Sequence, residues 1–428
     1  MTSQEATIAT DSDTDIEDVE SFRQRARAWI RANLEPAPAE PPPLRGGITD
    51  EQELAAVARD RELQGMLFEA GLAGICVPRE YGGQGLTPAH QRALNEELAG
   101  YEYPVRFQVP TFSPCAAVLL EFGTEEQKRR HIPAMLKGEE LWIQFLSEPS
   151  GGSDVAAALT TAVRDGDEWV LDGSKIWSSG AWWSDWALCL ARTNWDVPKH
   201  RGLTVFIFPV DREGVEIQRI EMLSGSTEFC QEFLTDVRVP DSDRVGDVDE
   251  GWTVGTRWMV HERMSFNSPL VTLPVGTGRA RTRISLVALA EEAGRLEDPL
   301  TRDLIGEARV LDLVRERLND RLGAGVASGR MHPQAPAIGR LFTGVASARR
   351  TTIAFEIAGG AGGTWSEDET AAEIGTDFLM RQVSCIGGGT TEIARNVISE
   401  RVLGMPREPT PDRTTPFRDV PRAPGKGA

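Results

Sequence analysis

The hydrophobic pattern changes twice along the chain, and this double change most constrains the fold. Up to about Glu140 apolar residues recur at helical spacing, as in Thr49–Glu69. Between about Trp142 and Val239 they form short runs typical of β-strands, and from Gly251 helical spacing returns. A chain of 428 residues is long enough for about two to four domains. The pattern therefore predicts an α+β protein with a strand domain between two helical domains.

The same patterns predict the individual elements and the limits of the domains. Helices are expected at 21–33, 49–69, 88–99, 125–136, 300–322, 336–358 and 391–403, and strands at 203–208, 215–220 and 229–239. Thr124 and Gln127 have the spacing of a capping box, and Asp172-Gly173 predicts a hairpin turn. We expect an acidic disordered arm over 1–20, an N-terminal helical domain over 21–140, a middle β domain over 141–249, a C-terminal helical bundle over 250–405 and a proline-rich tail over 406–428.

Composition excludes several classes of protein. The formal net charge is −19, and the first twenty residues hold seven carboxylates and no Lys or Arg, so nucleic-acid binding is not expected. No stretch reaches the roughly 18 apolar residues of a membrane span, and no secretory leader pattern is present, which favours a cytoplasmic protein. The five cysteines are scattered and never spaced as C-x-x-C, so reduced thiols and no metal site are expected.

Three segments carry the chemistry. They are residues 145–154 (FLSEPSGGSD), 173–181 (GSKIWSSGA) and 388–396 (GGTTEIARN). In this order and spacing they closely resemble the acyl-CoA dehydrogenase family of flavoenzymes, and the resemblance runs from about Phe22 to Glu408. Nucleotide-binding loops such as G-x-x-x-x-G-K-[ST] and the G-x-S-x-G nucleophile elbow are absent from the sequence.

The resemblance implies a fold, a cofactor and partners. The family fold has an N-terminal helical domain, a central β-barrel-like domain and a C-terminal four-helix bundle, with FAD between the last two. It implies an acyl-CoA substrate that loses its α-proton to a carboxylate and its β-hydride to flavin N5. An electron-transfer flavoprotein is the oxidant expected. The chain is expected to form a homo-oligomer, or a heterotetramer with a related chain, because a neighbouring subunit usually completes the FAD site.

The resemblance also assigns cofactor and substrate residues. Leu146 and Ser147, before Glu-Pro, are expected at the flavin, with Ser147 bonding its pyrimidine side. Trp177 is expected to cover one ring face and Ser179 to bond near N5, since a planar ring is suited to π contact and reduced flavin to fixed donors. The remaining cofactor contacts expected are Gly359 and Gly360 at the diphosphate or adenosine, and Thr390 and Glu392 at the adenosine half. Ser153 is expected near the CoA portion of the substrate.

The base and one diphosphate contact depart from the common pattern. The commonest subgroup has a glutamate directly before Gly-Thr, where this chain has Gly388. Some members carry the carboxylate on the helix after the β domain, before an Arg, which matches Glu262-Arg263. We therefore expect Glu262 as the base, Arg263 at the substrate, and the Gly388 N–H as an oxyanion donor. An Arg-x-x-Phe-Gly segment is missing around Glu291–Arg302, and its substitute stays open.

Two other interpretations stay open. The alternative for Glu262 is a helix-surface carboxylate paired with Arg263 or a neighbouring turn, and the room that Gly388 leaves favours the catalytic role. For the whole chain, the alternatives are a non-catalytic partner subunit of a heteromeric acyl-CoA dehydrogenase and, as a third interpretation, a flavin-dependent oxygenase on the same fold. The sequence does not specify whether the acyl group is fatty, branched or steroid.

Overall fold

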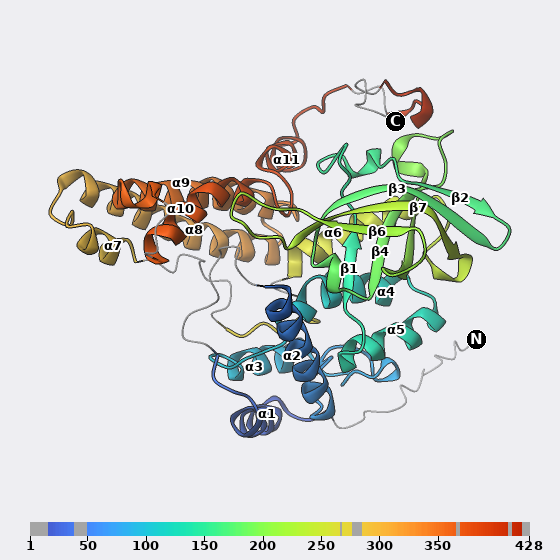
Figure 1. The fold of residues 1–428 in the computed structure, drawn as a ribbon, viewed down its shortest axis with the longest axis horizontal. Coiled ribbons are helices and arrows are strands. Elements are labelled where there is room, and N and C mark those ends of the chain that lie inside the picture. Colours follow the sequence, from blue (N-terminus) through green and yellow to red (C-terminus); the bar gives the residue numbers. More distant parts are fainter. Residues whose placement is uncertain are drawn as a thin grey trace, which may run out of the picture.

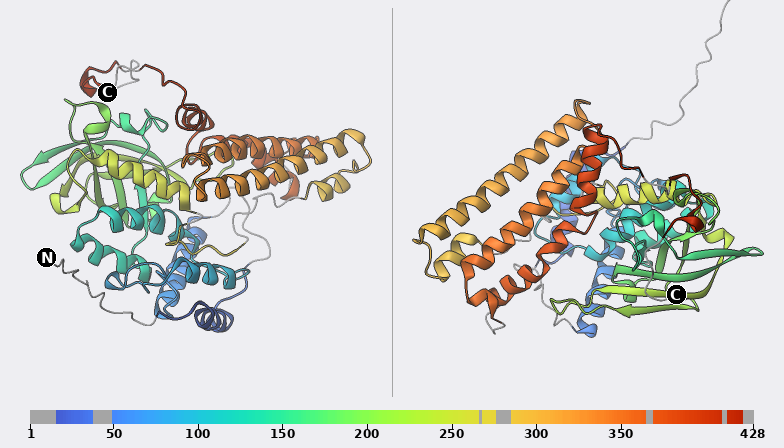
Figure 2. Two further views of the ribbon diagram at one scale, coloured as in Figure 1. Left: turned by 180° about the vertical axis from the view of Figure 1, so that it is seen from behind. Right: turned by 90° about the horizontal axis from the view of Figure 1, so that it is seen from above.

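The computed structural model describes residues 16–37, 49–265, 268–275, 285–364, 369–409 and 413–421. N-terminal helices and a single sheet lie together, and long C-terminal helices project from them as an arm (Figures 1 and 2). The chain order is thus helix, strand, helix, which confirms the α+β prediction. Residues 1–15 of the expected acidic arm lie outside the described residues. Asp18 caps the first helix, which begins at Val19, two residues before the expected start of the helical domain at residue 21.

The N-terminal helices follow their sequence signals closely. They are α1 (Val19–Asn33), α2 (Asp50–Glu69), α3 (Pro88–Glu97), α4 (Ala117–Phe122) and α5 (Glu125–Lys137), with the π-helical segment η2 (Phe107–Ala116) before α4. Thr124 and Gln127 form the predicted capping box, in which each side chain accepts a hydrogen bond from the other residue's backbone N–H. The apolar faces of α1, α2 and α3 share one core, with Phe22, Ile30 and Leu94 fully buried.

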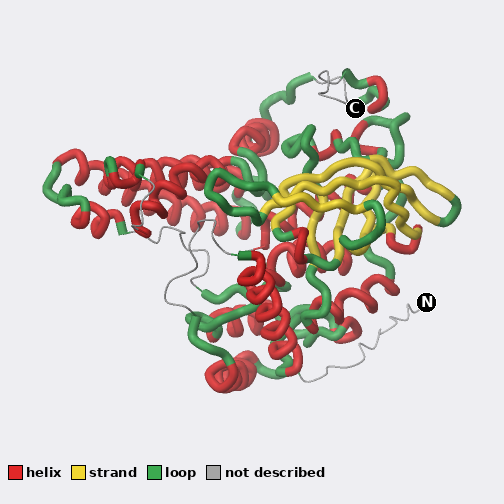
Figure 3. The backbone as a smooth tube through the Cα atoms, in the orientation of Figure 1, coloured by secondary structure: helices red, strands yellow, loops and turns green. Residues whose placement is uncertain are grey.

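The central part of the chain forms one sheet of eight strands (yellow in Figure 3). Its strands are β1 (Trp142–Phe145), β2 (Thr161–Asp165), β3 (Glu168–Ser179), β4 (Trp186–Arg192), β5 (Leu203–Pro209), β6 (Val215–Arg219), β7 (Phe229–Pro240) and β8 (Arg244–Val245). Their order is β6-β7-β3-β2-β4-β5-β8, with β1 pairing parallel to β4. Every residue of β4 is buried, as expected for a strand covered on both faces.

The hairpin predicted at Asp172-Gly173 is wrong. Glu168–Ser179 is one continuous strand, and the turn between β2 and β3 lies earlier, between Asp165 and Glu168. At Gly173 the pairing of β3 with β7 shifts register, and a Cβ there would approach Thr160 atoms to 2.6–2.8 Å. The glycine therefore marks a bulge with a close backbone neighbour, a second common use of glycine in strands.

The C-terminal helices divide into one that covers the sheet domain and several that form the arm. They are α6 (Gly251–Met264), α7 (Leu286–Glu292), α8 (Pro299–Ala327), α9 (Pro336–Ala358), α10 (Glu369–Met380) and α11 (Thr391–Val397). Helix α6 contacts β4, β5, α4 and η2, whereas α9 contacts α7, α8, α10 and α11. Among the described residues no helix is both long and apolar enough to cross a membrane.

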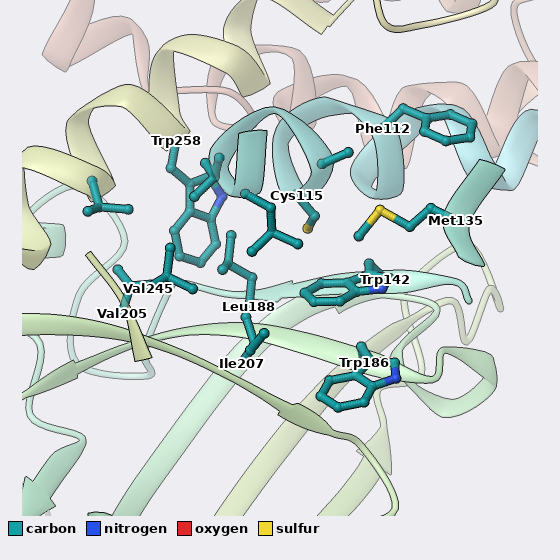
Figure 4. Packing of buried hydrophobic residues seen from close by; sticks show 14 of the residues in the cluster. Phe112, Cys115, Met135, Trp142, Trp186, Leu188, Val205, Ile207, Val245 and Trp258 are labelled. Atoms are coloured by element: carbon teal, nitrogen blue, oxygen red, sulfur yellow. The ribbon is translucent and has the colours of Figure 1, made fainter. Parts of the chain in front are cut away.

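A continuous apolar core joins α6 and η2 to the sheet. It includes Trp258 on α6, Cys115 on η2 and Leu188 on β4, all fully buried (Figure 4). Because well-packed cores resist small displacements, this packing fixes the position of α6 above the sheet. The same helix carries Glu262.

Candidate active site

Helix α6 is held in one orientation by a buried hydrogen bond. The Trp258 indole N–H donates to Gln144 Oε1 on β1 at 2.7 Å. In Figure 4 the Trp258 side chain extends from α6 toward the sheet. Glu262 follows four residues later, and residues four apart lie on one helix face. Strand β1 therefore helps to set the direction in which α6 presents Glu262.

The environment of Glu262 favours its neutral form more than water does. Burial raises the pKa of its carboxyl, and the nearby Arg263 cation opposes that shift only in part. The pKa of the Cys115 thiol on η2 is raised by burial and, second, by the charge of Glu262. The end of α6 is joined to η2 by the Ser113 hydroxyl, which donates to His261 O at 2.9 Å. No hydrogen bond or ion pair engages the Glu262 carboxylate within the described ranges. A partly buried, unpaired carboxylate with a raised pKa has the properties of a general base.

The glycine loop near the C-terminus lies beside the end of α6. A Cβ built on Gly389 would be 4.0 Å from Arg263 Nε. Gly388 is exposed, has a φ of +68°, and a Cβ there would meet no atom within 4 Å. The structure thus places Arg263 next to Gly389, the residue after Gly388, and Glu262 precedes Arg263 on the helix. Glu262 is the expected base, Arg263 the expected substrate residue and Gly388 the expected oxyanion donor.

Helix α9 holds this loop from behind. Arg340 donates hydrogen bonds to Ser384 O at 2.8 Å and to Gly387 O at 2.7 Å. After the loop, Thr390 caps α11, and its hydroxyl accepts the Ile393 N–H at 3.1 Å. Glu392 is exposed at the start of that helix, where hydrogen bonds from its own backbone N–H and from Thr391, with the Arg395 cation, lower its pKa. The inner side of the loop is therefore held by hydrogen bonds, and its outer side is exposed.

Trp177 lies at a bulge of β3 and is turned outward. The pairing with β7 shifts register between Ile176 and Ser178, and Trp177 has a φ of +70°, a region that few residues other than glycine occupy. Its indole is 52% exposed and meets the Phe229 ring edge-on at 5.8 Å. Ser179, at the end of the strand, is also exposed. Strained backbone that presents a large ring to the outside is common at binding sites.

The segment expected to bind the flavin pyrimidine is tied to the same strand. The Ile176 N–H donates to Ser147 O at 3.0 Å. The Lys175 ammonium, fully buried, donates to Glu148 Oε1 at 2.8 Å and reaches Leu146 O at 3.5 Å. Leu146 and Ser147 therefore sit next to the bulge that carries Trp177, and the structure brings these three together with Ser179.

Gly359 and Gly360 lie elsewhere, at the end of α9, where α7 ends and α8 begins and where the arm is farthest from the sheet (Figure 1). Arg295 donates to Glu356 O at 2.9 Å and Ile357 O at 3.1 Å there, and its Nη1 would lie 3.6 Å from a Cβ on Gly359. Within one chain these glycines do not meet Trp177 or Gly388. Arg295 falls within the stretch where the expected diphosphate arginine is missing.

Ser153 is exposed on the loop between β1 and β2. The next residue, Asp154, pairs with Lys199 at 2.7 Å, and a short turn, η3 (Val155–Ala157), follows. The loop therefore borders the sheet domain on the side of the 193–201 connection.

Comparison with known proteins decides the family. Residues 16–139 match the model described as acyl-CoA dehydrogenase, N-terminal domain, and residues 144–237 match the acyl-CoA dehydrogenase middle domain. Acyl-CoA dehydrogenase IpdE1 of Mycobacterium tuberculosis is 34% identical over 393 residues, which cover 92% of this chain and 99% of that protein. The chain belongs to the acyl-CoA dehydrogenase family. It is therefore an oxidoreductase, and the resemblance stated from its motifs is confirmed.

Further relatives and solved structures agree. Acyl-CoA dehydrogenase FadE34 of the same organism is 33% identical over 89% of this chain, although the match covers 51% of that protein. The solved structure of the Tcur3481-Tcur3483 steroid ACAD has a TM-score of 0.67 at 29% identity and covers 91% of this chain and 98% of that one. The ChsE4-ChsE5 complex from Mycobacterium tuberculosis has a TM-score of 0.66 at 24% identity, covering 93% and 100%. The expected fold of this acyl-CoA dehydrogenase is thereby confirmed.

Sequence reasoning missed the polar residues inside the sheet domain of this acyl-CoA dehydrogenase. The Glu148 carboxylate accepts the N–H groups of Leu159 and Thr160 at 2.6 and 3.0 Å in addition to Lys175. Glu232 is fully buried beside Ser178, and burial raises its pKa to about 8. Charged residues at inward positions of strands were the available signal, since such positions are normally apolar.

Proposed function

We propose that this enzyme catalyses FAD-dependent α,β-dehydrogenation of an acyl-CoA thioester to the trans-2-enoyl-CoA, with Glu262 as the base. The observation that carries the proposal is the position of the end of α6 beside the Gly388–Gly389 loop: a Cβ on Gly389 would lie 4.0 Å from Nε of Arg263, the residue after Glu262. Within the described part of the chain, the space at Gly388 is open and the Glu262 carboxylate on the adjoining helix is unpaired. Position 262 would therefore supply the carboxylate that position 388 lacks.

Glu262 and the glycine loop would act on neighbouring atoms of the substrate: Glu262 on the α-proton and the loop on the thioester carbonyl. The unprotonated Glu262 carboxylate accepts the α-proton, and its raised pKa makes it a stronger base than an exposed glutamate. The N–H of Gly387 bonds Val383 O at 3.0 Å, whereas no backbone partner engages the Gly388 N–H in the described part of the chain. That N–H can donate to the thioester carbonyl, where negative charge develops. Arg263, at the edge of the loop, would face the substrate.

FAD fits the exposed residues of β3 and the adjoining loop. Trp177 would cover one face of the ring system, Ser147 and Leu146 would contact its pyrimidine side, and Ser179 would donate near N5. When bound, FAD supplies the acceptor for the β-hydride. The exposure of the Trp177 indole supports this assignment. Among the described residues it meets one other ring, that of Phe229, so much of its apolar surface is open to a ligand.

A second chain would complete the cofactor site. Gly359 and Gly360 lie at the far end of the arm, so they, with Thr390 and Glu392, would reach the diphosphate and adenosine of FAD across a subunit interface. Four apolar side chains of α8 are exposed on the arm: Leu300, Val310, Leu313 and Val314. Such a surface favours an oligomer, either of this chain or with a related chain, as the two-part name of the similar Tcur3481-Tcur3483 enzyme suggests. An electron-transfer flavoprotein would reoxidise the flavin.

Anaerobic titration of the flavin tests the proposal. The purified protein should be yellow with non-covalent FAD, and excess acyl-CoA should bleach the oxidised flavin absorbance for at least one of a fatty, a branched and a steroid side-chain thioester. Bleaching by no acyl-CoA, with FAD bound, would favour the partner-subunit interpretation that Gly388 also permits. Oxygen-dependent product formation from a substrate that does not bleach the flavin anaerobically would favour an oxygenase.

A further inference from the structure

The C-terminal segment docks on the sheet domain far from the helix that precedes it. After α11 the chain returns to the sheet domain, and residues 415–420 lie against it (Figure 1). Phe417, at the start of a short turn, η12 (Phe417–Asp419), is 2% exposed. Its N–H donates to Val197 O at 2.9 Å, and the next N–H, of Arg418, donates to Trp195 O at 3.1 Å. A buried aromatic ring and two backbone hydrogen bonds make this a specific docking.

The ring of Phe417 covers a fully buried arginine. The Arg192 guanidinium carbon lies 3.9 Å from the Phe417 ring centroid, and the Trp195 ring stacks on Phe417 at 5.5 Å. A cation over an aromatic face is stabilised, and most strongly where water is excluded. Phe417 therefore closes one side of the pocket that holds Arg192.

Arg192 in turn fastens the loop that carries Ser153. Its guanidinium donates to Ala156 O at 2.6 Å and Ala158 O at 2.9 Å, and to Lys199 O at 3.2 Å. All three acceptors are backbone oxygens, so their position depends on where the guanidinium is held. The Lys199 ammonium adds a contact to Asp154 at 2.7 Å, beside Ser153.

We propose that Phe417 is a positioning residue for substrate binding: the docked C-terminal segment holds Arg192, and Arg192 holds the Ser153 loop in place for the CoA portion of the substrate. This role rests on the proposed function for its substrate, but the anchoring of the loop does not. The two can therefore be tested apart.

The first test needs no ligand. Hydrogen–deuterium exchange of the holoenzyme should be faster by about tenfold in residues 151–160 of Phe417→Ala, with the amides of α6 unchanged. Phe417→Tyr keeps the ring over Arg192 and should restore wild-type exchange. Arg418→Ala removes the exposed ion pair to Asp196, keeps the backbone hydrogen bonds, and should match the wild type. Unchanged exchange at 151–160 in Phe417→Ala would overturn the proposal.

The second test concerns the substrate, with coenzyme A as the probe. Phe417→Ala should raise the Kd for coenzyme A by about three- to tenfold and raise KM for an acyl-CoA that the wild type uses, while FAD content and kcat stay unchanged. Phe417→Tyr should restore both constants. Faster loop exchange with an unchanged Kd would refute the positioning role. If the wild type itself binds no coenzyme A, the proposed function fails, and the exchange result still decides whether the segment anchors the loop.

Discussion

Replacing Lys175 by methionine should destabilise the sheet domain strongly. The ammonium is fully buried, 2.8 Å from Glu148 Oε1 and 2.6 Å from Leu190 O. Methionine keeps much of the volume but leaves Glu148 buried without its cation. Removing one partner of a buried ion pair costs about 3–5 kcal/mol. The Leu159 and Thr160 N–H groups still bond Glu148, so we expect the lower half of that range.

Urea unfolding of the wild type and of Lys175→Met at pH 7 measures this cost. The control is Arg238→Met, which breaks an exposed pair with Asp165 and Glu168 in the same sheet domain and should cost at most about 1 kcal/mol. Burial raises the pKa of Glu148, but Lys175 and the backbone donors lower it further, so its net shift is downward. Its stabilising effect is therefore present at neutral pH and lost on acidification, and the deficit of Lys175→Met should shrink as the pH falls through the lowered pKa of Glu148. Equal losses for the two variants at pH 7 would refute the reasoning.

Three further predictions concern the site. Trp177→Ala should weaken FAD binding by about three- to tenfold through loss of ring contact, whereas Trp177→Phe should lose less; equal affinities by flavin fluorescence titration would remove Trp177 from the cofactor site. The rate of anaerobic flavin reduction should rise with pH through the raised pKa of Glu262. Arg263→Met should move this rise to higher pH, because the Arg263 cation lowers the pKa of Glu262. A rise at the same pH in Arg263→Met would argue against the influence of Arg263 on Glu262. Gly388→Ala should cost about 1–2 kcal/mol in thermal unfolding because its φ is +68°, although the space around it is open; no loss would show that the loop relaxes.

Most elements of the fold were predictable because their signals are local. The helix Pro336–Ala358 is bounded as its periodicity predicts, and the capping box at Thr124 forms as its two residues indicate. The false hairpin at Asp172-Gly173 shows the limit of such signals. A glycine required by the tertiary approach of Thr160 looks the same in sequence as one required by a turn.

Site residues that belong to a sequence motif were predictable, whereas contacts between segments distant in the sequence were not. Resemblance alone selected Glu262, and no periodicity could have placed the end of α6 beside the Gly388–Gly389 loop, more than 120 residues away. The docking of Phe417 on Arg192 was hidden for the same reason, because a proline-rich tail gives no local signal of a partner on the sheet. Contacts between remote segments depend on packing that single-sequence patterns do not contain.

The central claim is that Glu262 removes the α-proton. Its most direct test is single-turnover anaerobic reduction of the flavin by an acyl-CoA in Glu262→Gln, followed by stopped-flow absorbance. The control is Glu121→Gln, which disturbs α6 through Arg257 and His261, 2.7 and 2.9 Å from the Glu121 carboxylate, without touching the proposed base. We predict a rate about 10²–10⁴ lower in Glu262→Gln with nearly normal binding of FAD and acyl-CoA, and a rate near wild type in the control. Reduction of Glu262→Gln at the wild-type rate would contradict a role for Glu262 as the base.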